Sequence, residues 1–272
     1  MNFELNLTYD ATSETHEFLQ MSIERLIRYG WGGCALTVNV TTMKNIPPPP
    51  DPISLSKQAT AILERQYGLY VLADYTPFPQ FTRLNLITGN VQEVHQLTHR
   101  LPTITYDIIS VTPLSDAVFK TVCSTIDVDL ISIDVSQYQP KSCWKELKSA
   151  VNRDITIELL YSHLLGSDFE QKNLISACDS ISHATKGRKS KGRVVVLSCG
   201  KDDPEYIRSP SDVRNFGNLL QIPKFEKLTS EFAKVVIAKG LARKSNAGVV
   251  RKMKALPPEE DDMEITIMDA PA

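Results

Sequence analysis

The stretch from Asp107 to Val135 reads DIISVTPLSDAVFKTVCSTIDVDLISIDV and contains one complete strand–helix–strand unit. Its first part, Ile108 to Val111, is almost wholly apolar, which is what a strand covered on both faces requires. Ser115 then offers a side-chain oxygen that can cap a helix, and the apolar residues after it recur at helical spacing. A second apolar run, Leu130 to Val135, completes the unit. We therefore predict two parallel strands joined by a covering helix.

The same alternation continues toward both ends of the chain. Further strands are predicted at Phe3–Leu7, Cys34–Val40, Arg83–Thr88, Ile155–Ser162 and Arg193–Cys199. Further helices are predicted near residues 54–66, 91–100, 141–152 and 168–185, with one that ends near Gly30 and one that Ser209 caps. The five prolines between Ile46 and Pro52 predict a loop, because proline has no amide donor.

About seven strand–helix units within roughly 240 residues fit a TIM-like (β/α) barrel with an eighth unit imperfect or missing. An open, doubly wound sheet is the alternative architecture. We expect residues 1–254 to form one barrel domain with a basic C-terminal part. Residues 255–272 form an acidic tail that has little apolar surface to bury, so we expect it to be disordered.

The composition excludes several classes of protein. With 272 residues, 42% of them hydrophobic, the chain can build a sizeable core. Its apolar runs fall far short of the ~20 residues that a membrane-spanning helix needs, and the N-terminus lacks the pattern of a signal peptide. Five scattered cysteines suggest neither a zinc knuckle nor a redox pair. We expect an intracellular protein that does not associate with membranes.

The net charge of −2 hides a strong asymmetry along the chain. Residues 186–254 contain 17 basic and 6 acidic side chains, whereas residues 255–272 contain 6 acidic and no basic ones. Such a separation indicates a polyanionic partner.

Two clusters and two flanking arginines are the candidate binding residues. The first cluster is Lys186, Arg188, Lys189, Lys191 and Arg193; the second is Arg243, Lys244, Arg251, Lys252 and Lys254; Arg208 and Arg214 flank the helix that Ser209 caps. Cations on short, flexible segments can follow a phosphate backbone and release its counterions. Few aromatic residues accompany them, which favours recognition of structured RNA over stacking on unpaired bases. The alternative is a solvated loop.

The predicted strand ends offer few groups for catalysis. Asp134 and His163 follow two strands and could form an acid/base pair, but a structural or binding role is the stronger interpretation. A metal-dependent hydrolase needs several converging ligands, and the sequence shows no such set. We therefore predict no catalytic residue, no metal and no cofactor. The alternatives to an RNA-binding protein are a metal-dependent phosphoesterase and a barrel that binds only proteins.

Several segments, in the same order, resemble the family of the 30-kDa protein subunit of ribonuclease P and ribonuclease MRP. They are residues 83–87 (RLNLI), 106–111 (YDIISV), 127–133 (DVDLISI), 150–162 (AVNRDITIELLYS) and 192–198 (GRVVVLS). The helix entry IRSPSDV at 207–213 and the basic ending from Arg243 also resemble that family.

The resemblance implies a (β/α) barrel related to the PHP phosphoesterases, without their activity, because Asn6-Leu7-Thr8 replaces the early His-x-His of those enzymes. It implies an RNA-binding protein subunit of a particle whose own RNA removes 5′ leaders from precursor tRNA. The implied partners are the ribonuclease P/MRP RNA, a small ferredoxin-like subunit, other particle proteins and a second copy of the chain, with precursor tRNA bound indirectly. The implied location is the nucleus and nucleolus.

Overall fold

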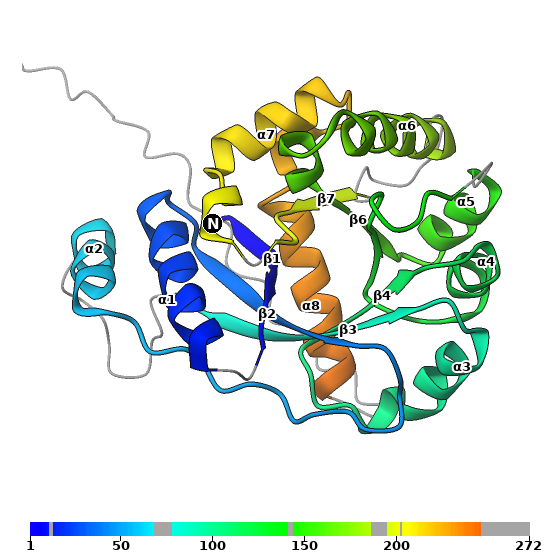
Figure 1. The fold of residues 1–272 in the computed structure, drawn as a ribbon, viewed down its shortest axis with the longest axis horizontal. Coiled ribbons are helices and arrows are strands. Elements are labelled where there is room, and N and C mark those ends of the chain that lie inside the picture. The colour runs from blue at the N-terminus through cyan, green and yellow to red at the C-terminus, as the bar shows by residue number, and fades with distance from the viewer. Residues whose placement is uncertain (11–12, 68–77, 141–143, 186–194, 202, 246–272) are drawn as a thin grey trace, which may run out of the picture.

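Seven parallel strands form one sheet in the computed structural model, which describes all residues except 11–12, 68–77, 141–143, 186–194, 202 and 246–272. The strands are β1 (Phe3–Thr8), β2 (Gly33–Val40), β3 (Gln80–Thr88), β4 (Ile108–Pro113), β5 (Leu130–Ile133), β6 (Thr156–Leu160) and β7 (Val195–Ser198). They are hydrogen-bonded in chain order, from β1 to β7. A doubly wound sheet reverses its order at a switch point. The structure therefore confirms the barrel and excludes the alternative (Figure 1).

Helices follow the strands and cover the outside of the sheet (Figure 1). The described helices are α1 (Ser13–Arg28), α2 (Lys57–Tyr67), α3 (Val91–Arg100), α4 (Asp116–Thr125), α5 (Trp144–Asn152), α6 (Asp168–Thr185), α7 (Pro210–Leu219) and α8 (Glu231–Ser245). Short 3-10 turns lie at Leu101–Thr103, Tyr161–Leu165, Pro204–Tyr206 and Phe225–Lys227. In the described part of the chain, no helix has both the length and the apolar character to span a membrane.

The predicted helix boundaries follow from side chains that satisfy free backbone groups. The Ser115 side chain accepts a hydrogen bond from the Val118 amide and begins α4. Ser209 and Asp212 form a reciprocal capping box at the start of α7. Gly30 adopts a φ of +81° just after α1, a conformation that glycine accepts without steric cost. These local signals are readable in the sequence, and the structure confirms them.

The seam between β7 and β1 is closed by a side chain instead of a regular strand ladder. Glu4 Oε1 accepts hydrogen bonds from the backbone amides of Asn6 (3.1 Å) and Cys199 (3.0 Å). The Gly200 amide also donates to the Asn6 carbonyl oxygen at 3.3 Å. The barrel is therefore nearly closed with seven strands, and an inward carboxyl group bridges its ends.

Helix α8 was not predicted, and it covers the end of the barrel where the strands begin. It contacts β1, β4 and β7, and the Phe3 amide donates to the carbonyl oxygen of Thr229 just before the helix. A Cβ atom built on Gly240 would lie 2.0 Å from the Asp107 carbonyl oxygen, so only glycine allows this approach. We call this end, with the described residues that directly precede β4 and β5, the N-terminal face.

Candidate functional site

The centre of the barrel contains a buried ion pair. The Arg83 guanidinium, from β3, donates to both Glu158 carboxylate oxygens on β6 at 2.6 Å, and both side chains have no exposed surface. Arg83 also donates to the Leu5 carbonyl oxygen and to the Ser110 hydroxyl, each at 2.8 Å. The interior is thus filled by a satisfied charge pair and is not a cavity for a substrate.

Glu4 lies in the same interior. Burial raises the pKa of its carboxyl group to about 8, and the nearby Glu158 carboxylate acts in the same direction. Its Oε2 atom has no hydrogen-bond partner among the described residues. A protonated Glu4 next to the Arg83–Glu158 pair leaves this region without net charge, which is the state that a buried site favours.

A pocket of about 650 Å³ opens where β1 and β2 end. Its lining residues are Thr8, Tyr9, Asp10, Val38, Asn39, Pro47, Pro48, Pro49, Pro50 and Asp51. The carboxyl ends of barrel strands are where enzymes of this fold place their active sites. The charged groups in this lining are aspartates, without lysine, arginine or histidine, so it is not suited to hold phosphate.

His163 connects two carboxylates at the end of β6. Its Nε2 lies 3.1 Å from Asp134 Oδ1 and its Nδ1 lies 3.2 Å from Glu170 Oε1, while the ring is 2% exposed. Although burial alone raises the pKa of Asp134, hydrogen bonds from His163 and Ser136 lower it to about 2. Asp134 and His163 therefore form the predicted pair. The His163 ring lies between two carboxylates and has almost no exposed surface, so a substrate has little access to it. Its contacts fix the turn before α6.

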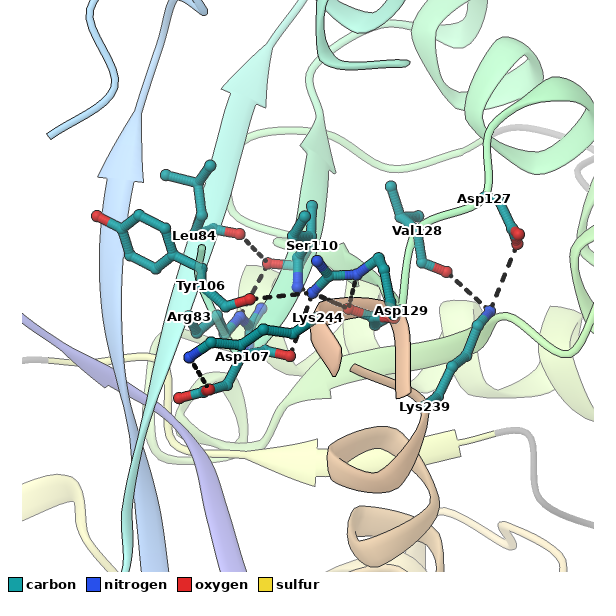
Figure 2. Close-up of polar contacts among 12 residues, drawn as sticks. Arg83, Leu84, Tyr106, Asp107, Ser110, Asp127, Val128, Asp129, Lys239 and Lys244 are labelled. Carbon is teal, nitrogen blue, oxygen red and sulfur yellow. Dashed lines mark hydrogen bonds and ion pairs between the residues drawn. The ribbon is translucent and has the colours of Figure 1, made fainter. Parts of the chain in front are cut away.

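The N-terminal face holds a second system of ion pairs (Figure 2). From the last turn of α8, Arg243 Nη2 lies 3.0 Å from Asp129 Oδ2, and Lys244 Nζ lies 2.6 Å from Asp107 Oδ1. The two aspartates directly precede β5 and β4. Each also accepts a backbone amide of the neighbouring strand at 2.8 Å, Asp107 from Thr82 and Asp129 from Ile109. The end of α8 is therefore tied to three adjacent strands.

Lys239 adds a third link one turn earlier in α8. Its ammonium group donates to the carbonyl oxygen of Val128 (3.0 Å) and lies 3.6 Å from Asp127 (Figure 2). It also donates to the Asp154 carbonyl oxygen at 3.2 Å. Burial raises the pKa of Asp129, and the nearby Arg243 opposes that shift. Asp129 Oδ1 and Arg243 Nη1 are buried without a hydrogen-bond partner in the described part of the chain.

The structure separates the predicted binding residues into groups. Arg243 and Lys244 lie on the N-terminal face, whereas Arg208 directly precedes the Ser209 cap of α7 and Arg214 lies within that helix. Helix α7 and the C-terminal end of α8 lie at opposite ends of the view (Figure 1). The other predicted residues, Lys186, Arg188, Lys189, Lys191, Arg193, Arg251, Lys252 and Lys254, lie outside the described residues. The structure does not test RNA contact by any of them, so these assignments stay predictions.

The described elements next to these two segments in the sequence, the start of β7 and the last turn of α8, both lie on the N-terminal face. Residues 186–194 lead into the first residue of β7, and strands of the barrel begin at the N-terminal face. Residues 246–254 continue from α8, whose last turn is fixed beside β4 and β5. Arg208 and Arg214 use their side chains locally, toward the Glu205 and Ile207 carbonyl oxygens and the Ser211 hydroxyl.

Sequence reasoning missed the residues that organise both systems: Arg83, Glu158, Asp107, Asp129 and Lys239. A signal for the first two was present, because Arg83 and Glu158 are each the one charged residue within a predicted strand. The aspartates before β4 and β5 are less conspicuous, because an acidic residue before a strand is also typical of a solvated turn.

These features define a class of protein: a nearly closed (β/α) barrel with an ion pair at its centre and cations concentrated late in its sequence. Among the residues described, no group of three or more histidine, cysteine, aspartate or glutamate side chains is placed to hold a metal ion. The chain belongs to the ribonuclease P subunit p30 family, whose model matches residues 1–245.

Relatives of known name agree with this family. Over 162 residues the chain is 31% identical to the ribonuclease P protein subunit drpp30 of Dictyostelium discoideum, which covers 59% of this chain and 41% of that protein. It is 27% identical over 192 residues to the mouse ribonuclease P protein subunit p30, covering 69% and 70% of the two chains. It is 23% identical over 184 residues to the Saccharomyces cerevisiae ribonuclease P/MRP protein subunit RPP1, covering 66% and 60%. The chain thus spans less than half of the Dictyostelium relative.

A solved structure has the same fold. The chain superposes on a component of an archaeal ribonuclease P with mature tRNA, with a TM-score of 0.60, 18% sequence identity and coverage of 95% of this chain and 100% of the other. At this identity the likeness shows the barrel fold, which agrees with the strand order found here.

Proposed function

We propose that the chain is a non-catalytic, RNA-binding subunit of ribonuclease P, shared with ribonuclease MRP. The observation that carries this proposal is the family match over residues 1–245. In this role the chain supports the removal of 5′ leaders from precursor tRNA, and rRNA processing through ribonuclease MRP, while the RNA of the particle performs the cleavage.

The geometry of the barrel supports a role without catalysis. The ion pair of Arg83 and Glu158 occupies its centre, and the pocket at the ends of β1 and β2 offers no cation for a phosphate group. His163 of the predicted acid/base pair contacts Glu170 as well as Asp134, so its ring is fixed between two carboxylates. None of these three described places combines an accessible pocket with groups suited to phosphate chemistry.

The charge distribution supports RNA as the partner. The two basic segments, at 186–193 and 243–254, lie close together in the sequence, one before β7 and one from the last turn of α8 onward. Lysine and arginine side chains replace counterions along a phosphate backbone, and each contact adds roughly 0.7–0.9 to the slope of log affinity against log salt. Arg208 and Arg214 form a separate contact from the side of α7.

We expect the other faces of the barrel to bind proteins. We propose a small ferredoxin-like subunit, other particle proteins and a second copy of the chain as partners, with precursor tRNA bound only through the particle. The expected location is the nucleus and nucleolus.

Recovery of the chain from cells under native conditions, followed by sequencing of the attached RNA, tests this function. We expect the ribonuclease P and MRP RNAs to be enriched. A chain recovered with proteins but without RNA would contradict an RNA-binding role, and bound metal with turnover of a phosphodiester would favour a phosphoesterase. An exposed-cation control, Lys120→Gln, should recover the same RNAs as the unchanged chain.

A further inference from the structure

In the part of the basic region that the structure describes, the last turn of α8 is held by polar contacts to the residues before β4 and β5. Arg243 donates to Asp129 and also to the Tyr106 and Asp107 carbonyl oxygens, at 3.2 and 3.1 Å. Lys244 donates to Asp107 at 2.6 Å, and that carboxylate also accepts the amide and the hydroxyl of Thr82. Both cations thus end on groups that are themselves fixed by the sheet.

These contacts leave the two cations poorly placed to bind phosphate. The Arg243 side chain is only 17% exposed and its Nη1 atom is buried. Lys244 is more exposed, at 41%, but its ammonium group would have to leave the Asp107 carboxylate to reach another anion. Gly240 brings this part of the helix so close to the Asp107 carbonyl oxygen that the helix has little room to shift.

We propose that Arg243 and Lys244 are positioning residues and do not contact RNA. Their ion pairs with Asp129 and Asp107 fix the last turn of α8 on the N-terminal face. They thereby fix the point from which the sequence continues toward Arg251, Lys252 and Lys254. This inference rests on the proposed RNA-binding function and changes the role that the sequence predicts for two of its residues.

Direct contact and positioning predict opposite results when Asp107 loses its charge. If Lys244 binds phosphate, Asp107→Asn frees its ammonium group and removes a nearby negative charge, so RNA affinity rises. If Lys244 is an anchor, the same substitution loosens the helix end, and RNA affinity falls although the chain has become more positive.

The test measures affinity of the full chain for a transcript of the ribonuclease P RNA from its own organism. The matched control is Asp127→Asn, which makes the same change in charge on the same face but at a carboxylate that is 74% exposed and 3.6 Å from Lys239. We expect Asp107→Asn to weaken binding about two- to fivefold, the range that one partly exposed ion pair provides, and Asp127→Asn to leave it unchanged or slightly tighter. Equal or tighter binding by both variants would overturn the proposal.

A charge exchange keeps the test valid if Asp107→Asn folds poorly. The double variant Asp107→Lys with Lys244→Asp rebuilds the pair, so we expect affinity to recover relative to Lys244→Asp alone, whereas a direct phosphate contact by Lys244 predicts no recovery. Amide hydrogen exchange of residues 240–245 should rise in Asp107→Asn and not in Asp127→Asn. If the unchanged chain binds no RNA, the proposed function fails and this inference fails with it; if it binds and Asp107→Asn binds equally well, only the inference fails.

Discussion

The centre of the barrel and its N-terminal face both contain ion pairs, but in different surroundings. Arg83 and Glu158 are fully buried and bound at both carboxylate oxygens. Asp107 and Lys244 are 13% and 41% exposed, and Arg243 keeps a buried nitrogen without a partner among the described residues. A buried pair costs much free energy when one member is removed, whereas water replaces a lost partner at an exposed pair. We therefore expect the central pair to contribute more to the stability of the fold, and the face pairs to fix the last turn of α8.

The largest expected effect comes from breaking the central pair. Glu158→Ala leaves the Arg83 guanidinium buried without its counter-charge, so we expect a loss of about 3–5 kcal/mol in the free energy of unfolding, measured by urea denaturation. The double variant Arg83→Met with Glu158→Leu removes both charges and should recover at least half of that loss. A single variant as stable as the unchanged chain would show that the centre is accessible to water.

The close approach of α8 to the strand ends is the next feature to break. Gly240→Ala places a methyl group 2.0 Å from the Asp107 carbonyl oxygen, so the helix must move away from the barrel. We expect a loss of about 2–3 kcal/mol in the thermal or urea unfolding free energy. Gly89→Ala is the control, because the nearest atom to its added carbon is 3.7 Å away. Equal effects at the two positions would contradict the contact.

The pH dependence of stability tests whether Glu4, at the centre of the barrel, is protonated in the folded chain. Burial raises its pKa from the ordinary value of 4.5 to about 8, so the folded chain holds this proton more tightly than the unfolded chain does. The contribution of Glu4 to the free energy of unfolding is therefore complete below about pH 4.5 and is lost as the pH rises to 8 and above. Glu4→Gln imitates the protonated form and should be more stable than the unchanged chain at pH 9, by on the order of 2 kcal/mol.

Chemical denaturation at pH 5 and pH 9 measures this effect. The exposed Glu64→Gln should show the pH dependence of the unchanged chain. If Glu4→Gln also keeps that dependence, Glu4 is ionised in the folded state and the assignment of its proton is wrong.

The smallest effect on stability is expected at the more exposed of the two face pairs, Asp107 with Lys244. Asp107→Asn removes an ion pair whose lysine is 41% exposed, so we expect a loss below about 1 kcal/mol, while RNA affinity changes in the direction given above. A change in melting temperature comparable to that of Glu158→Ala would contradict the distinction between the two systems.

Most of the fold could be predicted from the sequence because its signals are local. Apolar runs identified the seven strands, and Ser115 and Ser209 marked helix starts that the structure confirms. Helix α8 was missed because apolar residues such as Val235 and Leu241 lie outside its buried stripe of Phe232, Val236 and Ile237 and obscure the helical period.

The candidate site was less predictable because its contacts join residues far apart in the chain. Charge counting identified the basic region, but it could not show that Arg243 and Lys244 are paired with Asp129 and Asp107, more than a hundred residues earlier. It also named Arg208 and Arg214 beside the predicted helix, and the structure places them directly before the Ser209 cap and within α7.

The salt dependence of RNA binding tests the central claim most directly. The measurement compares the full chain with a variant in which Lys186, Arg188, Lys189, Lys191 and Arg193 are glutamine, and with a control of equal charge in which Lys44, Lys57, Arg65, Lys120 and Lys172, all exposed, are glutamine. We predict that the slope of log affinity against log salt falls by about 3 in the first variant and by less than about 1 in the control. An equal slope in all three proteins would contradict the claim that the basic segments of this barrel bind the phosphate backbone of RNA.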